Sequence, residues 1–115
     1  MKVSELTGDN LDYWVAKAQP NSGIYIASNG KPYISYDSCE ADYYHPSTNW
    51  QQCGELITDF GIEVKPLQNR MDGSWYAICK YYSCYRNNGS VGLSAQEAIC
   101  RAIVASVYGE EVSDE

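Results

Sequence analysis

Residues 93–112 read LSAQEAICRAIVASVYGEEV, and this stretch predicts the helix against which the rest of the chain packs. Ser94 and Glu97 form an S-x-x-E capping box, in which each side chain satisfies a backbone N–H group at the helix start. Arg101 follows Glu97 by one turn, a spacing typical of an ion pair worth about 0.3–0.5 kcal/mol. Small and apolar residues recur at steps of three and four and predict one apolar face: Ala95, Ala98, Ile99, Ala102, Ile103, Ser106 and Val107.

Two further segments show the same helical spacing. In the first, Thr7 stands where a helix cap is expected, and residues 8–19 follow it. The second opens at a T-x-x-Q capping box formed by Thr48 and Gln51, and it ends near residue 60 before a glycine. Each has an apolar face, made of Leu11, Trp14, Val15 and Ala18 in the first and of Cys53, Leu56, Ile57 and Phe60 in the second.

Four segments are expected to form strands, and they come in two pairs. They are residues 24–28, 31–36, 62–67 and 74–82. The first pair flanks Asn29-Gly30, a strong hairpin signal, and residues 37–46 and 83–92 are expected as loops. The sequence therefore predicts an α+β fold in the order α-β-β-α-β-β-α, with a small antiparallel sheet of about four strands sandwiched by helices. Residues 1–115 are expected to form a single domain.

The composition is acidic and rich in tyrosine. The 15 aspartates and glutamates outnumber the 8 lysines and arginines, and the resulting net charge of -7 disfavours direct nucleic-acid binding. Residues 1–11 contain no apolar leader segment and no run approaches about 18 apolar residues, so we expect neither a signal peptide nor a membrane span. The 5 irregularly spaced cysteines then indicate reduced thiols in a cytoplasmic protein. The 11 tyrosines suit sheet surfaces and interfaces.

Three stretches resemble the NinX-like family of small phage and prophage proteins. Thr7-Gly8 followed by Leu11-Asp12-Tyr13-Trp14-Val15-Ala16 resembles the start of that family. Tyr44-His45-Pro46-Ser47-Thr48-Asn49-Trp50 is similar to its central Y-S-P-S-T-x-W stretch. Residues 98–106, followed by Gly109-Glu110-Glu111-Val112, resemble its last helix and G-D-E-V ending. The same landmarks are similar to the related phage α-β-α sandwich domain, and the resemblance spans residues 3–112.

The resemblance implies a phage or prophage origin, expression in the bacterial cytoplasm of the host cell, and a sandwich of helices around a sheet. The family supplies no established activity, so no catalytic residue is carried over to this chain. Two segments depart from the family pattern. Gln51-Gln52-Cys53-Gly54-Glu55 replaces a glycine-glycine-proline-like continuation, and the tyrosine- and cysteine-rich residues 76–85 match nothing in it.

Metal binding and catalysis find little support in the sequence. Asp37, Glu40, Asp42 and His45 are the ligand types that magnesium or manganese uses, but their spacing matches no known metal loop and a solvated acidic loop explains them better. The cysteines lack the close pairing of a zinc site, and no motif pairs the single histidine, His45, with a nucleophile. We therefore expect no metal, no cofactor and no enzymatic activity.

Tyr43, Tyr44, His45 and Trp50 form the predicted interaction surface, because tyrosine and tryptophan dominate the energetics of protein interfaces. For Trp50, packing against the core at the start of its helix is an equally good interpretation. The expected function is a non-enzymatic protein-interaction module whose partner is a host or phage protein. The sequence leaves open whether the chain also forms a homo-oligomer.

The alternative function is linked to nucleic acid in one of two ways. The acidic residues could mimic DNA phosphates and occupy a basic host protein. Otherwise, basic residues interleaved with tyrosines near the last two strands could bind a single strand weakly. These basic residues are Lys65, Arg70, Lys80 and Arg86, and the tyrosines are Tyr76, Tyr81, Tyr82 and Tyr85.

Overall fold

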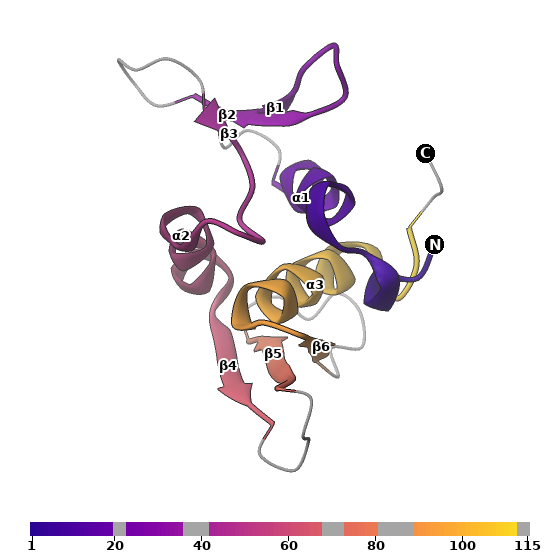
Figure 1. The fold of residues 1–115 in the computed structure, drawn as a ribbon, viewed down its shortest axis with the longest axis vertical. Helices are drawn as coiled ribbons and strands as arrows, with labels where there is room; N and C mark the ends of the chain where they lie inside the picture. Colours follow the sequence, from indigo (N-terminus) through magenta and orange to yellow (C-terminus); the bar gives the residue numbers. More distant parts are fainter. Residues whose placement is uncertain (20–22, 36–41, 68–72, 81–88, 113–115) are drawn as a thin grey trace.

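Helix α3 (Ala95–Tyr108) runs through the middle of the molecule, as the sequence predicts (Figure 1). The computed structural model describes residues 1–19, 23–35, 42–67, 73–80 and 89–112. In chain order these form the 3-10 helix η1 (Val3–Glu5), α1 (Gly8–Lys17), β1 (Ile24–Ile26), β2 (Pro32–Ile34), β3 (Asp42–Tyr43), α2 (Trp50–Phe60), β4 (Ile62–Pro66), β5 (Trp75–Cys79), β6 (Ser90–Gly92) and α3. The described residues thus have an α+β fold, which confirms the predicted class.

Helix α3 is buried on nearly every side, whereas its sequence predicts a single apolar face. The strands β4, β5 and β6 cover one side of the helix, and α1 and α2 pack against the rest of it. A helix enclosed in this way needs small and apolar residues all round. Its residues without exposed surface are Ala98, Ile99, Cys100, Ala102, Ile103 and Val104. The predicted cap is present, since Ser94 Oγ accepts a hydrogen bond from the N–H of Glu97 at 3.1 Å.

The strands form two antiparallel sheets, β1-β2-β3 and β4-β5-β6. The predicted single sheet of four strands is therefore wrong, and the predicted order α-β-β-α-β-β-α omits β3 and β6. Both omitted strands lie in segments expected as loops, and they contain only 2 and 3 residues. Strands this short cannot display an alternating apolar pattern. The three strands before α2 form one sheet and the three strands after it form the other.

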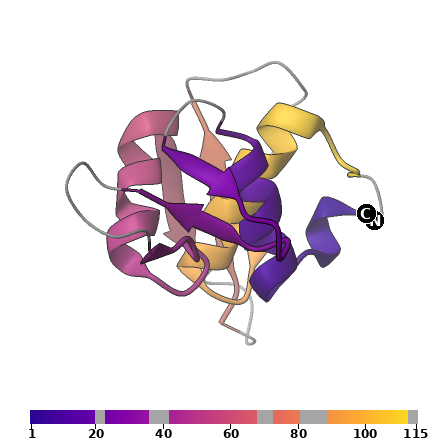
Figure 2. The same ribbon diagram turned by 90° about the horizontal axis from the view of Figure 1, so that it is seen from above.

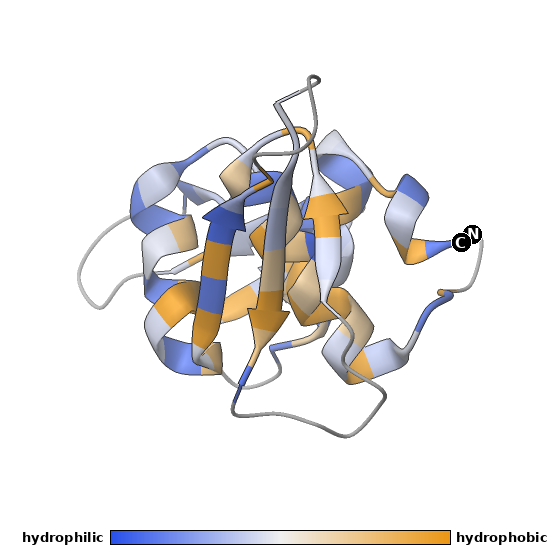
Figure 3. Ribbon diagram, turned by 90° about the horizontal axis from the view of Figure 1, so that it is seen from below, coloured by the Kyte–Doolittle hydropathy of each residue, from blue (hydrophilic) through white to orange (hydrophobic). Residues whose placement is uncertain are grey.

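The helices lie between the two sheets rather than around one sheet (Figure 1 and Figure 2). Helix α1 packs against β1 and β2, α3 packs against β4, β5 and β6, and the two helices contact each other. The inner face of the second sheet contributes Ile62, Ala77 and Cys79 to the core. Its other face carries the exposed Glu63 and Lys65, and Figure 3 shows this alternation of hydropathy along β4.

Helix α2 begins one residue later than its predicted capping box. The N-cap is Asn49, whose side chain accepts a hydrogen bond from the N–H of Gln52 at 3.1 Å. The hydroxyl of Thr48, the predicted cap, lies instead 2.9 Å from Nδ1 of His45. The predicted end is confirmed, because Gly61 follows Phe60 with φ of 62°, a left-handed conformation that glycine adopts easily.

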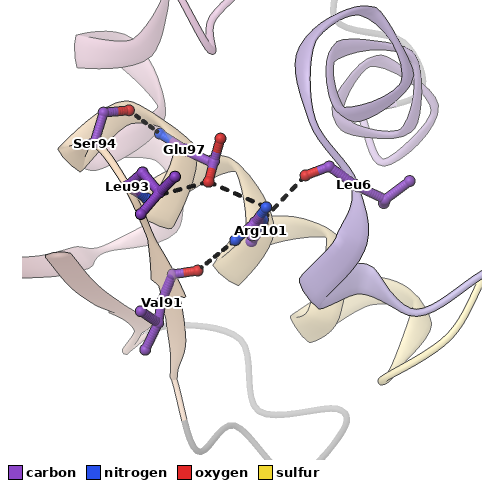
Figure 4. A network of polar contacts seen from close by, with 6 residues as sticks. All are labelled: Leu6, Val91, Leu93, Ser94, Glu97 and Arg101. Carbon is purple, nitrogen blue, oxygen red and sulfur yellow. Dashed lines mark hydrogen bonds and ion pairs between the residues drawn. The ribbon is translucent and has the colours of Figure 1, made fainter. Parts of the chain in front are cut away.

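Arg101 is only 9% exposed and joins three parts of the chain (Figure 4). Its Nε donates to the carbonyl oxygen of Leu6 at 3.0 Å, and its Nη1 donates to the carbonyl oxygen of Val91 at 2.8 Å. Its Nη2 lies 3.1 Å from Oε1 of Glu97, and that same oxygen accepts from the N–H of Leu93 at 3.1 Å. The side chain therefore links the segment before α1, strand β6 and the start of α3.

Gly92→Ala is expected to destabilise the fold, because β6 passes very close to the start of α3 at this position. A Cβ atom there would lie 2.5 Å from the backbone nitrogen of Ala98 and 2.9 Å from Cβ of Glu97. Overpacking of this kind costs about 1–3 kcal/mol. Urea unfolding of Gly92→Ala measures the loss.

Gly54→Ala is the matched control for this substitution. Gly54 lies inside α2 and nothing approaches its Cβ position within 4 Å. This control should stabilise the protein by about 0.5–1 kcal/mol, because alanine favours a helix. Equal losses in the two variants would show that the close approach of β6 to α3 is not the cause.

Candidate functional site

Three tyrosines stand in a row across one face of sheet β1-β2-β3, and we call them the tyrosine row. The register pairs Tyr25 with Tyr33 and Tyr33 with Tyr43. The ring centroids are 5.9 Å apart in the first pair and 5.0 Å in the second, with interplanar angles of 21° and 26°. The rings therefore stack side by side. Tyr25 is 46% exposed and Tyr43 is 56% exposed.

The tyrosine row faces away from α1 because side chains alternate along a strand. The neighbouring pair, Ile24 and Ile34, lies on the opposite face and packs on the core side of the sheet. Two contacts orient the rings, since Asn29 Nδ2 donates to the hydroxyl of Tyr33 at 3.1 Å and Lys31 Nζ lies 5.9 Å from the ring centroid of Tyr43. The row is thus an ordered aromatic surface on the outside of the molecule.

A pocket of about 650 Å³ lies next to the start of α1, and we call it the α1 pocket. Its lining comes from the first turns of α1, from residues 30–32 before and at the start of β2, and from the segment that joins β3 to α2. Tyr43 belongs both to the tyrosine row and to this lining. A volume in this range suits a small ligand or a side chain of a partner protein.

The carboxylate of Asp12 connects α1 to the opposite wall of the α1 pocket. Its Oδ1 accepts from the N–H of Ser47 at 2.9 Å, and its Oδ2 accepts from Oγ of Ser47 at 3.0 Å. Burial raises the pKa of Asp12 to about 6, because the loss of solvation outweighs the hydrogen bonds from Ser47 and the nearby His45. A carboxyl group that titrates near neutral pH in a pocket is typical of functional sites.

Gln52 fixes the backbone of the segment between β3 and α2, which forms the wall opposite α1. Its Nε2 donates to the carbonyl oxygen of Tyr43 at 2.8 Å, and its Oε1 accepts from the N–H of His45 at 2.7 Å. Between these two residues Tyr44 turns inward, and its hydroxyl accepts from Nε2 of Gln19 at 2.7 Å. Burial raises the pKa of Tyr44 well above its ordinary value. The side chains of Asp12 in α1, of Gln19 two residues after its end and of Gln52 in α2 therefore fix the wall.

The four predicted interaction residues do not share one surface. Tyr43 and Trp50 are each 56% exposed, whereas Tyr44 is 3% exposed and belongs to the core. His45 is half-buried and lines the α1 pocket. The exposure of Trp50 disagrees with the interpretation that this side chain packs against the core.

The predicted acidic loop lies only partly within the described residues. Asp42 is exposed and His45 is half-buried, while Asp37 and Glu40 fall outside the described residues. In the part of the chain that the structure describes, no group of three or more histidine, cysteine, aspartate or glutamate side chains is arranged to hold a metal ion. Within the same ranges, every helix falls short of the length and apolar character that a membrane crossing requires.

The cysteines considered for zinc behave as core residues where they are described. Cys53, Cys79 and Cys100 are buried thiols. Burial raises the pKa of Cys79, as expected for a thiol in apolar surroundings. Cys39 and Cys84 lie outside the described residues.

Two of the four basic residues considered for single-strand binding are described, and both already contact another side chain. Lys65 Nζ lies 5.5 Å from the ring centroid of Tyr76, and Lys80 Nζ lies 3.7 Å from a carboxylate oxygen of Glu63. The two arginines, at positions 70 and 86, fall outside the described residues, as do three of the four tyrosines, at positions 81, 82 and 85.

Sequence reasoning overlooked three residues of the site: Tyr25, Tyr33 and Asp12. The two tyrosines lie on either side of the predicted hairpin turn, which indicated that they could pair across it. Asp12 lies three residues before Val15 and four before Ala16, both buried, so the helical spacing already placed this carboxyl group beside the apolar face.

The family model described as "Bacteriophage P22, NinX" matches residues 2–107. The match therefore includes the tyrosine row, the α1 pocket and nearly all of α3. No curated protein matches the chain.

Proposed function

The chain belongs to the family of the bacteriophage P22 NinX protein, and from this premise we propose that it is an accessory phage protein that binds another protein. Its partner is a protein of the phage or of the host, and the binding takes place in the bacterial cytoplasm without a catalysed reaction. The tyrosine row forms the centre of the binding surface. The observation that carries this proposal is the exposed stack of Tyr25, Tyr33 and Tyr43.

An aromatic stack of this kind suits protein recognition for two reasons. Tyrosine contributes a large contact area while only two side-chain torsions become ordered, so binding loses little entropy. The rings here are already held by each other and by the hydrogen bond from Asn29 to Tyr33, so part of that ordering precedes binding. Scattered exposed apolar residues are ordinary on a protein surface, but three stacked rings in one sheet are a concentrated patch.

The charge of the chain supports a basic partner. The net charge of -7 attracts positively charged proteins and raises their association rate at low salt. The described part of the second sheet offers less support for direct nucleic-acid binding, because Lys65 and Lys80 already contact neighbouring side chains. Mimicry of DNA by the acidic surface remains the competing proposal.

Capture of partners from phage-infected cells, followed by affinity measurement with the purified partner, tests the proposal. The double variant Tyr25→Ala and Tyr43→Ala should weaken binding at least about tenfold, which is typical of two interface tyrosines. Both side chains are about half exposed, so the fold should survive, and thermal unfolding checks this. Leu93→Ala removes a side chain that is 70% exposed far from the tyrosine row along the chain and serves as the control.

Three outcomes would count against the proposal in different ways. Unchanged affinity in the double variant would exclude the tyrosine row as the surface, and an effect of Trp50→Ala alone would move the surface to the start of α2. A partner lost on nuclease treatment would favour a nucleic-acid-linked role. A steep loss of binding to a basic DNA-binding protein with added salt, without any effect of the tyrosine variants, would favour mimicry.

A further inference from the structure

The α1 pocket combines carboxylates with aromatic residues. Its lining includes Asp9, Asp12, Tyr13, Tyr43 and Tyr44. The carboxylate of Asp12 is 3% exposed and takes its hydrogen bonds from Ser47. Among the described residues no lysine or arginine forms an ion pair with it. The nearby His45 favours the charged form of this carboxylate, but burial outweighs that effect, so a cation that enters the same pocket would stabilise the carboxylate further.

Two of the three tyrosines of the lining already contact cations of the same chain. Lys17 Nζ lies 5.3 Å from the ring centroid of Tyr13, and Lys31 Nζ lies 5.9 Å from that of Tyr43. Both distances fall within the range of a cation–π interaction. Each of these two rings therefore already stabilises a positive group.

We propose that the α1 pocket receives an arginine side chain of the partner protein, with its guanidinium group near Asp9 and Asp12. Arginine suits this pocket better than lysine, because its planar group pairs with a carboxylate through two hydrogen bonds and stacks on aromatic rings. Tyr43 lies in both surfaces, so one partner can cover the tyrosine row and fill the pocket. The inference rests on the proposed function, because it names the chemistry of that partner.

Two features of the pocket favour an anion instead. Lys31 and His45 belong to the lining, and the side chain of Thr7 does not cap the first N–H groups of α1. Asp9 and Asp12 oppose an anion at the same place. The two kinds of ligand therefore respond in opposite directions when Asp9 or Lys31 loses its charge, and this difference makes the test decisive.

The test uses the tripeptide Gly-Arg-Gly, blocked at both ends, and the same peptide with neutral citrulline in place of arginine. Each is titrated into the full-length chain at pH 7 while the backbone N–H signals are followed by NMR. The arginine peptide should shift the signals of residues 8–13 and 43–48, and the citrulline peptide should bind about tenfold more weakly or not at all. Equal binding of the two peptides, or no shift with either, would overturn the proposal.

Two charge variants show whether the pocket prefers a positively or a negatively charged ligand. Both side chains are exposed, so the variants should keep the fold, and their NMR spectra verify this. Asp9→Asn should lower the affinity for the arginine peptide about threefold, and Lys31→Gln should raise it about threefold, as expected for single exposed charges. The reverse pattern would identify an anion site and refute the proposal.

Tyr25→Ala separates this proposal from the proposed function. Tyr25 belongs to the tyrosine row but not to the pocket lining. The variant should therefore lower the affinity for the partner protein and leave the affinity for the arginine peptide unchanged. If Tyr25→Ala weakens binding of the partner but the arginine peptide does not bind to the pocket, the proposed function stands and only this inference is excluded.

Discussion

Replacing Arg101 with methionine is expected to lower the free energy of unfolding by about 3–5 kcal/mol. Methionine fills similar space but removes every donor, so the carbonyl oxygens of Leu6 and Val91 lose their partner in a site that is only 9% exposed. The carboxylate of Glu97, 3.1 Å from the guanidinium, also loses its counter-charge. Urea unfolding measures the loss, as a lower midpoint with an unchanged slope.

Arg101→Lys is the informative control for this variant. A lysine keeps the positive charge but cannot reach three acceptors at once, since its single ammonium group lacks the planar fork of arginine. It should therefore recover only part of the loss. A methionine variant within about 1 kcal/mol of the native protein would show that the contacts in Figure 4 contribute little to stability.

The sequence identified this pair but not its importance. The spacing of Glu97 and Arg101 predicts a pair of the strength usual on a helix surface. The structure buries both side chains, with 18% and 11% of their surface exposed, because β6 and the segment before α1 meet at this point. Contacts of this kind join residues 95 positions apart, and local spacing carries no information about them.

The tyrosine row shows a second limit of local patterns. A two-residue turn at Asn29-Gly30 would pair Tyr25 with Ile34 and would so place Tyr25 and Tyr33 on opposite faces of the sheet. The observed loop is one residue longer, because Ala27 pairs with Lys31, and it brings Tyr25 opposite Tyr33. Gly30, with φ of 81°, takes the left-handed position that such a three-residue loop requires. The hairpin was thus predictable, but its register was not.

Helix faces were predicted more accurately than the site. The apolar spacing selected Leu11, Val15, Cys53 and Leu56, all buried. The neighbouring residues Tyr43 and Tyr44 were assigned to the same surface, but they lie on opposite sides, because Tyr44 directly follows β3, still pairs with Pro32 and continues the alternation of the strand. That alternation was hidden, since β3 contains only 2 residues within an acidic segment.

Asp12→Asn is expected to stabilise the protein at pH 7 by about 2 kcal/mol. Burial raises the pKa of Asp12 in the folded state to about 6, from an ordinary value of 3.8. The folded state therefore binds a proton more tightly than the unfolded state. This contribution to stability is full below about pH 4 and is lost as the pH rises through about 6. Two pKa units correspond to about 3 kcal/mol, and the weaker hydrogen bonds of an amide to Ser47 offset part of the gain.

Unfolding measured from pH 4 to pH 8 tests this prediction. The advantage of Asp12→Asn should grow between about pH 4 and pH 7 and should be smallest at the acid end, because the native carboxyl group is protonated in both states only below its ordinary pKa of 3.8. Asp9→Asn is the matched control, because Asp9 is exposed in the first turn of α1, three residues before Asp12. Its charge favours the helix start, so that variant should be neutral or slightly destabilising. A less stable Asp12→Asn protein at pH 7 would mean that the Ser47 hydrogen bonds outweigh the burial of charge.

A stabilising substitution in a pocket has a functional meaning. If the carboxylate of Asp12 lowers stability at neutral pH, we expect it to have a role outside the fold, as is common at binding sites. Pairing with an arginine of the partner is such a role, because a cation beside the carboxylate favours its charged form. The same Asp12→Asn variant should then have a higher free energy of unfolding in the absence of a ligand and a lower affinity for the blocked arginine peptide. Greater stability with unchanged peptide affinity would remove Asp12 from the binding site and leave its role in joining α1 to Ser47.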